Sequence, residues 1–306
     1  MSSLSVYNEA LDHDFLLRPG NTNCGGCGMS IGLTMFGRVL EEAHEKAVMV
    51  IPACCGIVTA GAFPTTSYQT PVIASTFAAA PAFASGVAAV HRLTDNPAHV
   101  VCWAGDGGTY DIGLGTLSAA AERNENIIYI CYDNEIYGNT GGQRSSATPP
   151  GARTTTTASG KREPKKDVMS ILAAHRIPYA ATLSVAHPED FKRKVRHALK
   201  EKGLRFLLML SPCPTGWKSE SDYSVDLVRR AVRSGLFPLY EVFDGARYRV
   251  NAAPDGLDVA EYFKGQNRFP MDSLDLSAAR ETVAKESARL KTLAETWPAE
   301  ATEGMA

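Results

Sequence analysis

Residues 104–113 read AGDGGTYDIG, and residues 129–139 read YICYDNEIYGN. One apolar run precedes Asp106, a second precedes Asn134, and a single helix-like segment lies between them. This arrangement predicts two neighbouring strands of an α/β sheet, each ending in a polar side chain. Ligands of such sheets bind outside the carboxyl ends of the strands. The two stretches therefore predict the fold and the edge of the sheet that carries a site.

Asp106 and Asn134 offer a carboxylate and an amide oxygen, and the carbonyl of Ile136 is a further candidate ligand. A hard cation such as Mg²⁺ takes oxygen ligands of this kind together with phosphate oxygens. A helix that starts near Ile112 would present free N–H groups to the anion. Neighbouring glycines permit close backbone approach to a phosphate: Gly105, Gly107 and Gly108. The alternative is that Asp106 only caps a helix; the presence of Asn134 at the next strand end favours a metal–diphosphate site.

Apolar runs alternate with helix-like patterns along the chain. The runs predict strands at 46–51, 99–103, 127–132, 179–185 and 206–210. The helix-like patterns occupy 29–44, 78–93, 113–123, 167–175 and 188–202. This alternation predicts an α/β fold, a parallel sheet with helices on both faces.

Two further regions have a different character. Residues 144–166 contain three prolines, two glycines and six basic residues, but only one acidic residue, Glu163. A loop this long is usually functional or disordered, and we expect a functional or interface loop. Beyond residue 230 we expect an extension that wraps the core or a partner. A short helix is expected at 226–235, where this region begins, and strand-like pieces follow within 237–250. The region ends in a helix at 275–297, capped by Asp275 or Ser277.

Bulk composition limits the classes of function. The chain has 306 residues, 44% of them apolar and 21% charged, with a net charge of -2. This balance gives no reason to expect nucleic acid or a membrane surface as a partner, and no apolar run is long enough for a membrane span. Residues 1–5 lack the basic start and apolar core of a signal peptide, so we expect a cytoplasmic protein.

Five of the seven cysteines lie outside the predicted strands and can supply a set of four metal ligands. Cys24 and Cys27 form a C-x-x-C motif, Cys54-Cys55 follows one predicted strand, and Cys213 follows another. Four thiolates from three loops suit a [4Fe–4S] cluster and equally a Cys₄ zinc site. Cys102 and Cys131 lie within apolar strands and are expected in the core. None of the seven histidines shares ligand spacing with the cysteines.

Taken in order, these motifs resemble a known family. They are the C-x-x-C-G motif at 24–28, ACC at 53–55, the two stretches quoted above, AAHRIPYAAT at 173–182 and SPCPTGW at 211–217. The chain resembles the thiamine-diphosphate-binding β subunit of 2-oxoacid:ferredoxin oxidoreductases, the pyruvate synthase family, over roughly residues 17–245. The resemblance implies a thiamine diphosphate-binding fold in residues 1–230, which also carries the cluster, and a C-terminal extension in residues 231–306.

The resemblance also assigns roles to residues. Asp106, Asn134 and the carbonyl of Ile136 would hold Mg²⁺ on the diphosphate. Asn139 would face the substrate near the thiazolium ring as a catalytic residue. The remaining cofactor-binding residues would be Gly105, Gly107, Gly108, Thr109 and Thr140. The cluster ligands would be Cys24, Cys27, Cys55 and Cys213.

The chain departs from the family pattern at two places. Relatives commonly carry Gly where this chain has Cys54, and the distance of Cys55 from Phe63-Pro64 favours Cys55 as the ligand. Residues 71–81 read PVIASTFAAAP, whereas relatives that act on pyruvate often carry aromatic, His and Phe-Glu-Asn residues there. The second departure leaves the identity of the 2-oxoacid open.

The implied activity is thiamine-dependent oxidative decarboxylation of a 2-oxoacid, with electrons passing singly to a [4Fe–4S] cluster and usually with formation of acyl-CoA. Pyruvate, oxalate and aromatic oxoacids are candidate substrates. The implied partners are subunits that supply the pyrimidine-binding domain and its catalytic glutamate, and a ferredoxin or ferredoxin-like subunit. The alternatives are a non-redox thiamine decarboxylase or synthase with a structural Cys₄ zinc site, and a scaffold subunit that has kept only the fold.

Overall fold

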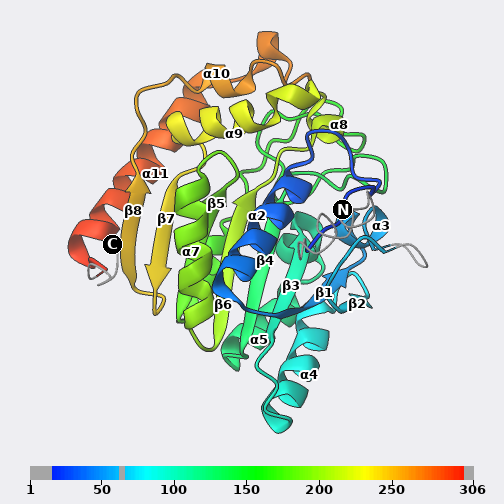
Figure 1. Ribbon diagram of the computed structural model, residues 1–306. Helices are drawn as coiled ribbons and strands as arrows, with labels where there is room; N and C mark the ends of the chain where they lie inside the picture. Colours follow the sequence, from blue (N-terminus) through cyan, green and yellow to red (C-terminus); the bar gives the residue numbers. More distant parts are fainter. Residues whose placement is uncertain (1–15, 62–65, 300–306) are drawn as a thin grey trace, which may run out of the picture.

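The computed structural model describes residues 16–61 and 66–299 (Figure 1). Residues 1–5 and Phe63-Pro64, used above, lie outside these ranges. The architecture is one eight-stranded sheet with the order β2-β1-β3-β4-β6-β5-β7-β8. The strands are β1 (Ala47–Pro52), β2 (Val72–Ser75), β3 (His99–Gly105), β4 (Ile127–Asp133), β5 (Tyr179–Ser184), β6 (Leu204–Leu210), β7 (Leu239–Phe243) and β8 (Arg247–Ala252).

The first six strands in chain order are parallel, as the sequence predicts, and the last two are antiparallel. Every residue of β4, β5 and β6 is buried. Their side chains are mostly apolar and do not alternate with polar ones, because helices cover both faces of the sheet and neither face meets solvent. The core therefore lies along the middle of the sheet, directly below the edge that carries Asp106 and Asn134.

Helices cover the two faces in layers. Figure 1 shows α2 (Gly28–Ala43) and α7 (Pro188–Lys200) in front of the sheet, where they pack against each other. On the opposite face α4 (Ala80–Leu93) packs against α5 (Leu114–Glu122), as the right-handed crossovers of parallel strands require. The other helical elements are α3 (Cys55–Val58), α6 (Val168–Ala174), α8 (Pro214–Trp217), α9 (Ser224–Arg233), α10 (Ala260–Phe263) and α11 (Leu276–Thr296), with shorter turns at Ser221–Tyr223 and Met271–Ser273.

The C-terminal region continues the sheet. The two strand-like pieces expected within 237–250 are β7 and β8, which extend the sheet beyond β5, and α11 packs along β8 (Figure 1). Asp275, one of the two expected caps, accepts a 2.9 Å hydrogen bond from the amide of Ala278. Glu241 of β7 is buried and accepts hydrogen bonds from Tyr179 of β5 and Asn251 of β8, so its carboxylate ties three strands together. The division at residue 230 stays a prediction.

Two expectations need correction. The edge strand β2 was not predicted, because its four residues are only partly buried and carry too short a pattern. The helical turn after β3 does not start near Ile112. A π-helical turn spans Gly107–Asp111 directly after Asp106, and α5 follows it. Single π turns of this kind are common at functional sites. Free N–H groups therefore begin beside Asp106, closer to the strand end than expected.

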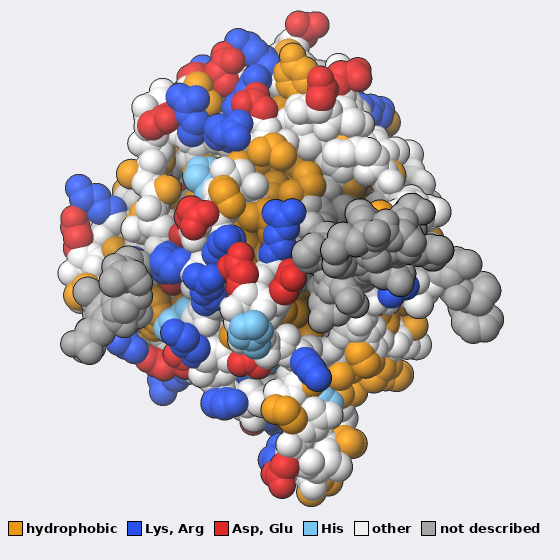
Figure 2. All heavy atoms as spheres, in the orientation of Figure 1, with side chains coloured by type: hydrophobic (Ala, Val, Ile, Leu, Met, Phe, Trp, Pro, Cys, Tyr) orange, Lys and Arg blue, Asp and Glu red, His pale blue; other side chains and the backbone are white. Residues whose placement is uncertain are grey.

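The surface view shows Lys and Arg side chains interspersed with Asp and Glu over α7 and α9 (Figure 2). Pairs on and between helices account for much of this mixing, including Arg193–Asp190, Arg196–Glu42 and Arg230–Asp226. This face thus carries no broad patch of one sign. Within the described ranges, no helix is long and apolar enough to cross a membrane.

Candidate cofactor site

Two adjoining cavities lie at the carboxyl edge of the sheet. One has a volume of about 450 Å³ and is lined by the thiols of Cys24, Cys27, Cys55 and Cys213. The other, of about 240 Å³, is lined by Gly105, Asp106 and Gly107 of the first stretch and by Cys54, Phe77 and Tyr137. Both share the same wall, made of Cys55, Asn134, Ile136, Gly138 and Asn139. The candidate cluster ligands and the candidate diphosphate ligands therefore line adjoining cavities, and Cys55, Asn134 and Ile136 line both.

The three oxygen ligands expected for Mg²⁺ lie together. One terminal atom of the Asn134 amide is 2.7 Å from the carbonyl oxygen of Ile136 and 2.9 Å from Oδ1 of Asp106. If this atom is the amide nitrogen, Asn134 donates hydrogen bonds to both oxygens. If it is the amide oxygen, three oxygen acceptors lie close together, from Asn134, Ile136 and Asp106. Neighbouring ligands of an octahedron with bonds of 2.0–2.1 Å are about 2.9 Å apart. The two distances from Asn134 are therefore those expected between neighbouring ligands of a magnesium ion.

The side chain of Asp106 does not cap the helical turn that follows it. It makes no capping hydrogen bond there, which overturns the alternative weighed from the sequence. It is buried, and Ser145 Oγ donates a 2.5 Å hydrogen bond to Oδ2. Burial, and then the nearby Asp133 carboxylate, raise the pKa of Asp106. A buried carboxylate is costly to ionise without a partner. A cation bound beside Asp106 would therefore stabilise its charged form.

The structure does not bring every expected cofactor residue to a cavity. Gly105, Gly107, Asn139 and Thr140 line the smaller cavity, whereas Gly108 and Thr109 line neither. The hydroxyl of Thr109 donates back to the carbonyl of Gly105 at 2.8 Å and lies in the core. At Gly107 a Cβ atom would lie 2.3 Å from the Tyr137 ring and 2.9 Å from Phe77. Glycine is required there by this aromatic pair, whatever phosphate approaches the backbone.

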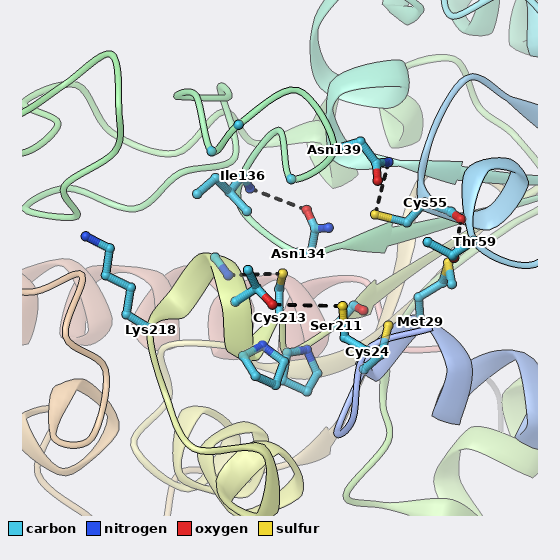
Figure 3. A pocket seen from close by; sticks show the side chains of 18 of the residues that line it. Cys24, Met29, Cys55, Thr59, Asn134, Ile136, Asn139, Ser211, Cys213 and Lys218 are labelled. Atoms are coloured by element: carbon cyan, nitrogen blue, oxygen red, sulfur yellow. Dashed lines mark hydrogen bonds between the residues drawn. The ribbon is translucent and has the colours of Figure 1, made fainter. Parts of the chain in front are cut away.

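The four thiols surround the larger cavity. Figure 3 shows Cys24, Cys55 and Cys213 around one hollow, from the loop before α2, from α3 and from the start of α8. Polar groups already point at the sulfurs: Asn139 Nδ2 lies 3.2 Å from Cys55 Sγ, and the Gly216 amide 3.4 Å from Cys213 Sγ. Burial, and then the neighbouring thiols, raise the pKa of Cys55 to about 12. Metal binding would replace the protons of such crowded thiols and stabilise their thiolate form.

Cys54 occupies a different place from its neighbour. Its side chain is buried and lines the smaller cavity, whereas Cys55 lines both. The backbone separates the two thiols because Cys54 is the extended residue before α3, and Cys55 is the first residue of the helix. Cys102 and Cys131 are fully buried in β3 and β4, so the prediction that they are core residues is confirmed.

Comparisons with known proteins decide the family. Residues 53–209 match the family described as "Thiamine pyrophosphate enzyme, C-terminal TPP binding domain". The chain is 44% identical over 291 residues to ketoisovalerate oxidoreductase subunit VorB of Pyrococcus horikoshii, covering 90% of this chain and 92% of that protein. It is 44% identical over 260 residues to pyruvate synthase subunit PorB of Methanothermobacter marburgensis, covering 83% and 89%.

The chain is a 2-oxoacid:ferredoxin oxidoreductase β subunit by family. The resemblance inferred from the motifs is thereby confirmed, as are a thiamine diphosphate-binding domain and a role as one oxidoreductase subunit of a larger enzyme. A solved 2-oxoglutarate:ferredoxin oxidoreductase from Magnetococcus marinus superposes with a TM-score of 0.57, over 70% of this chain and 79% of that chain, at 23% identity. This likeness confirms the fold.

In this β subunit the long loop at 144–166 folds over the site. Besides the Ser145–Asp106 contact, Lys165 Nζ lies 2.6 Å from Asp133 Oδ2 and 2.9 Å from Glu135 Oε1. Both carboxylates are buried and flank Asn134 in sequence. Lys165 therefore neutralises the strand end on which the candidate metal ligand stands, which agrees with the expectation of a functional loop.

The buried ion pairs were not found from the sequence. Arg268, far along the chain, places Nη2 2.6 Å from Glu135 Oε2. Its guanidinium also lies 4.2 Å from the centre of the Trp217 ring. Lys165 and Arg268 together lower the pKa of Glu135, although burial alone would raise it. Arg268 and Glu135 are 133 positions apart, so no local pattern would have identified this pair.

Proposed function

We propose that this chain holds the diphosphate end of thiamine diphosphate through Mg²⁺, and that the four thiols of the larger cavity hold a [4Fe–4S] cluster beside it. The observation that carries the proposal is the shared wall: Asn134 and Ile136 of the candidate magnesium set and Cys55 of the candidate cluster set line both cavities. A redox cluster in a cavity that adjoins the cofactor is the arrangement that single-electron transfer needs.

The oxygen set supports Mg²⁺. Asp106 would supply the negative ligand, while Asn134 and the carbonyl of Ile136 would supply neutral ones, with Asn134 2.7 and 2.9 Å from the other two oxygens. All three residues line the smaller cavity, where the diphosphate would supply further oxygen ligands. Ser145 fixes Oδ2 of Asp106 so that Oδ1 stays turned toward Asn134.

The cysteine set supports a cluster over a single zinc ion. In the part of the chain that the structure describes, no three His, Cys, Asp or Glu side chains come close enough to hold one metal ion. The four thiols line a 450 Å³ cavity instead of meeting at one point. A tetrahedral zinc needs all four sulfurs within about 2.3 Å of one centre, whereas a [4Fe–4S] cube spreads its ligands around itself.

The chain's own residues bind, orient and exclude water. Bound thiamine diphosphate supplies the carbon nucleophile and electron sink for decarboxylation, and a bound cluster accepts electrons one at a time. Asn139 donates toward Cys55 and lines both cavities, so it lies where an amide can contact substrate and cluster ligand alike. Phe77 and Tyr137 meet edge to face at 6.2 Å and close the outer wall of the smaller cavity.

The substrate is proposed to be a 2-oxoacid with an uncharged side chain. No Lys or Arg is among the described residues that line the smaller cavity, and Asp106 is its one carboxylate. The relatives named above are a ketoisovalerate oxidoreductase subunit and a pyruvate synthase subunit, which agrees with this class. Phe77→Ala should open the wall and shift the ratio of kcat/KM about tenfold toward bulkier oxoacids, because pocket volume sets discrimination of this size. Phe83→Ala, on the exposed face of α4, is the control.

Partners are proposed from what the site lacks. No glutamate is among the described residues that line either cavity. The carboxylate that must contact the aminopyrimidine ring is therefore expected from another subunit with the pyrimidine-binding domain. A ferredoxin or ferredoxin-like subunit would take the electrons, and coenzyme A the acyl group. A cytoplasmic location remains an expectation.

Metal analysis of the anaerobically purified complex tests the proposal. We expect iron, acid-labile sulfide and 2-oxoacid-dependent reduction of a one-electron acceptor. Stoichiometric zinc without labile sulfide, together with product formation in the absence of any acceptor, would instead identify the non-redox decarboxylase or synthase. A scaffold subunit would bind no thiamine diphosphate, and Asp106→Ala would then change nothing.

A further inference from the structure

One helical turn joins a candidate cluster ligand to the backbone of a candidate magnesium ligand. The turn α8 begins after Cys213 and ends at Trp217, whose amide donates to the carbonyl of Cys213 at 2.7 Å. The Trp217 indole is fully buried, and its Nε1 donates a 2.8 Å hydrogen bond to the carbonyl oxygen of Asn134. Cys213 and Asn134 are thus linked through a single helical turn and one hydrogen bond.

The same two segments touch at further points. The amide of Ser211 donates to the carbonyl of Asp133 at 2.9 Å, so the main chains after β4 and β6 run bonded to each other. At Gly216 a Cβ atom would lie 2.7 Å from Ile136 Cγ2 and 3.2 Å from Cys213 Sγ. Gly216 therefore packs tightly between Ile136 and the Cys213 thiol. A shift of the segment after β4 would consequently move the segment after β6 as well.

The indole cannot easily rotate away from Asn134. Arg268 stacks on its ring at 4.2 Å and pairs with Glu135 at 2.6 Å. The Trp217 ring also meets Tyr262 edge-on, at 6.1 Å between ring centres. Cation–π stacking and a buried ion pair at these distances fix the plane of the ring. The N–H of Trp217 is consequently aimed at the Asn134 carbonyl by neighbours on both sides.

We propose that Trp217 is a positioning residue that couples the two cofactor sites. Its N–H holds the Asn134 main chain, so that the oxygens of Asn134 and Ile136 stay opposite Asp106. Because α8 links Trp217 to Cys213, the position of the Asn134 main chain also depends on the position of Cys213. The inference rests on the function proposed above. Coupling of this kind is reciprocal in binding free energy: loss of the cluster weakens Mg²⁺–thiamine diphosphate binding, and loss of Mg²⁺–thiamine diphosphate weakens retention of the cluster.

Trp217→Phe in the intact complex removes the N–H donor and keeps an aromatic ring. The Asn134 carbonyl is then left without this donor in a buried place, and we expect thiamine diphosphate to bind about 5- to 20-fold more weakly at limiting Mg²⁺. Isothermal titration calorimetry with thiamine diphosphate at several Mg²⁺ concentrations measures this. The matched control is Trp103→Phe: Trp103 is equally buried, but its Nε1 has no hydrogen-bond partner among the described residues, so the variant loses ring volume alone.

A second comparison separates coupling from plain structural damage. In the unmodified complex, chelation of the cluster should weaken Mg²⁺–thiamine diphosphate binding, whereas in Trp217→Phe the same chelation should add little. If Trp217→Phe does not assemble, Gly216→Ala tests the contact from the other side, because the added methyl displaces Ile136 or Cys213. Gly216→Ala should show the same loss of Mg²⁺-dependent affinity.

The outcomes are distinct. Absence of Mg²⁺-dependent thiamine diphosphate binding in the unmodified complex would overturn the proposed function, and the coupling with it. Normal binding in the unmodified complex with equal affinity in Trp217→Phe would overturn the coupling alone. Equal losses in Trp217→Phe and Trp103→Phe would also overturn it, since the effect would then follow from ring volume.

Discussion

Ser145 Oγ donates a 2.5 Å hydrogen bond to Oδ2 of Asp106, while Oδ1 of the same carboxylate faces the Asn134 amide. The loop at 144–166 thereby sets the orientation of the Asp106 carboxylate, directly after β3. The hydroxyl of Ser145 also accepts from the amide of Ala147 at 2.9 Å, which fixes its own position. The carboxylate is thus oriented by a side chain 39 positions away in sequence.

Ser145→Ala should weaken Mg²⁺ binding in the presence of thiamine diphosphate by about three- to tenfold. Loss of one hydrogen bond to a carboxylate costs about 1 kcal/mol and lets Asp106 rotate. Calorimetric titration with Mg²⁺ measures the change. Ser146→Ala is the control, because the Ser146 hydroxyl donates to Asp111 and does not contact Asp106. An unchanged Mg²⁺ affinity in Ser145→Ala would count against Asp106 as a metal ligand.

Cys55→Ser should abolish the cluster, and Cys54→Ser should preserve it. Cys55 lines the cavity with the other three candidate ligands, whereas Cys54 lines the smaller cavity only. Iron and acid-labile sulfide assays on anaerobically purified variants, with the visible absorption of the cluster, measure the difference. Retention of full iron by Cys55→Ser with loss in Cys54→Ser would reverse the assignment of the third ligand.

Lys165→Met should destabilise the chain strongly. Its ammonium pairs with Asp133 and Glu135, whose side chains are 0% and 6% exposed, and truncation leaves Asp133 without its cation. Breaking a buried ion pair from one side costs about 3 kcal/mol or more. We expect the midpoint of thermal unfolding of the complex to fall by about 5 °C or more.

Lys166→Met is the control for that substitution. Lys166 lies 3.7 Å from Asp111, and both side chains are partly exposed. A loss in Lys166→Met as large as in Lys165→Met would mean that the loop depends on its general charge and not on the buried carboxylates.

Stability at acid pH should depend on Glu241. Burial alone would raise its pKa, but hydrogen bonds from Arg193, Asn251 and Tyr179 and the charge of Arg193 hold the pKa below its usual value. The stabilisation is therefore complete above about pH 4.3, the value in an unfolded chain, and is lost as the pH falls through the lower pKa of the folded state.

Glu241→Gln should accordingly lower the thermal midpoint at neutral pH and flatten its decline between about pH 5 and pH 3, as followed by circular dichroism. Glu42→Gln is the control. Glu42 pairs with Lys192 and Arg196 on the surface, where such pairs contribute little. An unchanged acid limb in Glu241→Gln would show that its carboxylate does not secure β7 and β8 to the sheet.

Much of the fold was predictable because its signals are local. Continuous apolar runs predicted β1, β3, β4, β5 and β6 to within a few residues, and Asp275 was correctly named among the caps of α11. The weak edge strand β2 and the π-helical start at Gly107 were not predicted. Partly buried strands lack a continuous pattern, and a π turn has no residue signature of its own.

The sequence by itself determined the chemistry available: polar oxygen groups after two neighbouring strands, a C-x-x-C motif before the first strand, cysteines after two other strands, and a motif order that marks the family. Only the tertiary structure decided which groups meet. Ser145 on Asp106, Arg268 on Glu135 and Trp217 on Asn134 are each joined across 39 to 133 positions. Such contacts leave no spacing in the chain, because they are set by the packing of loops at one edge of a sheet.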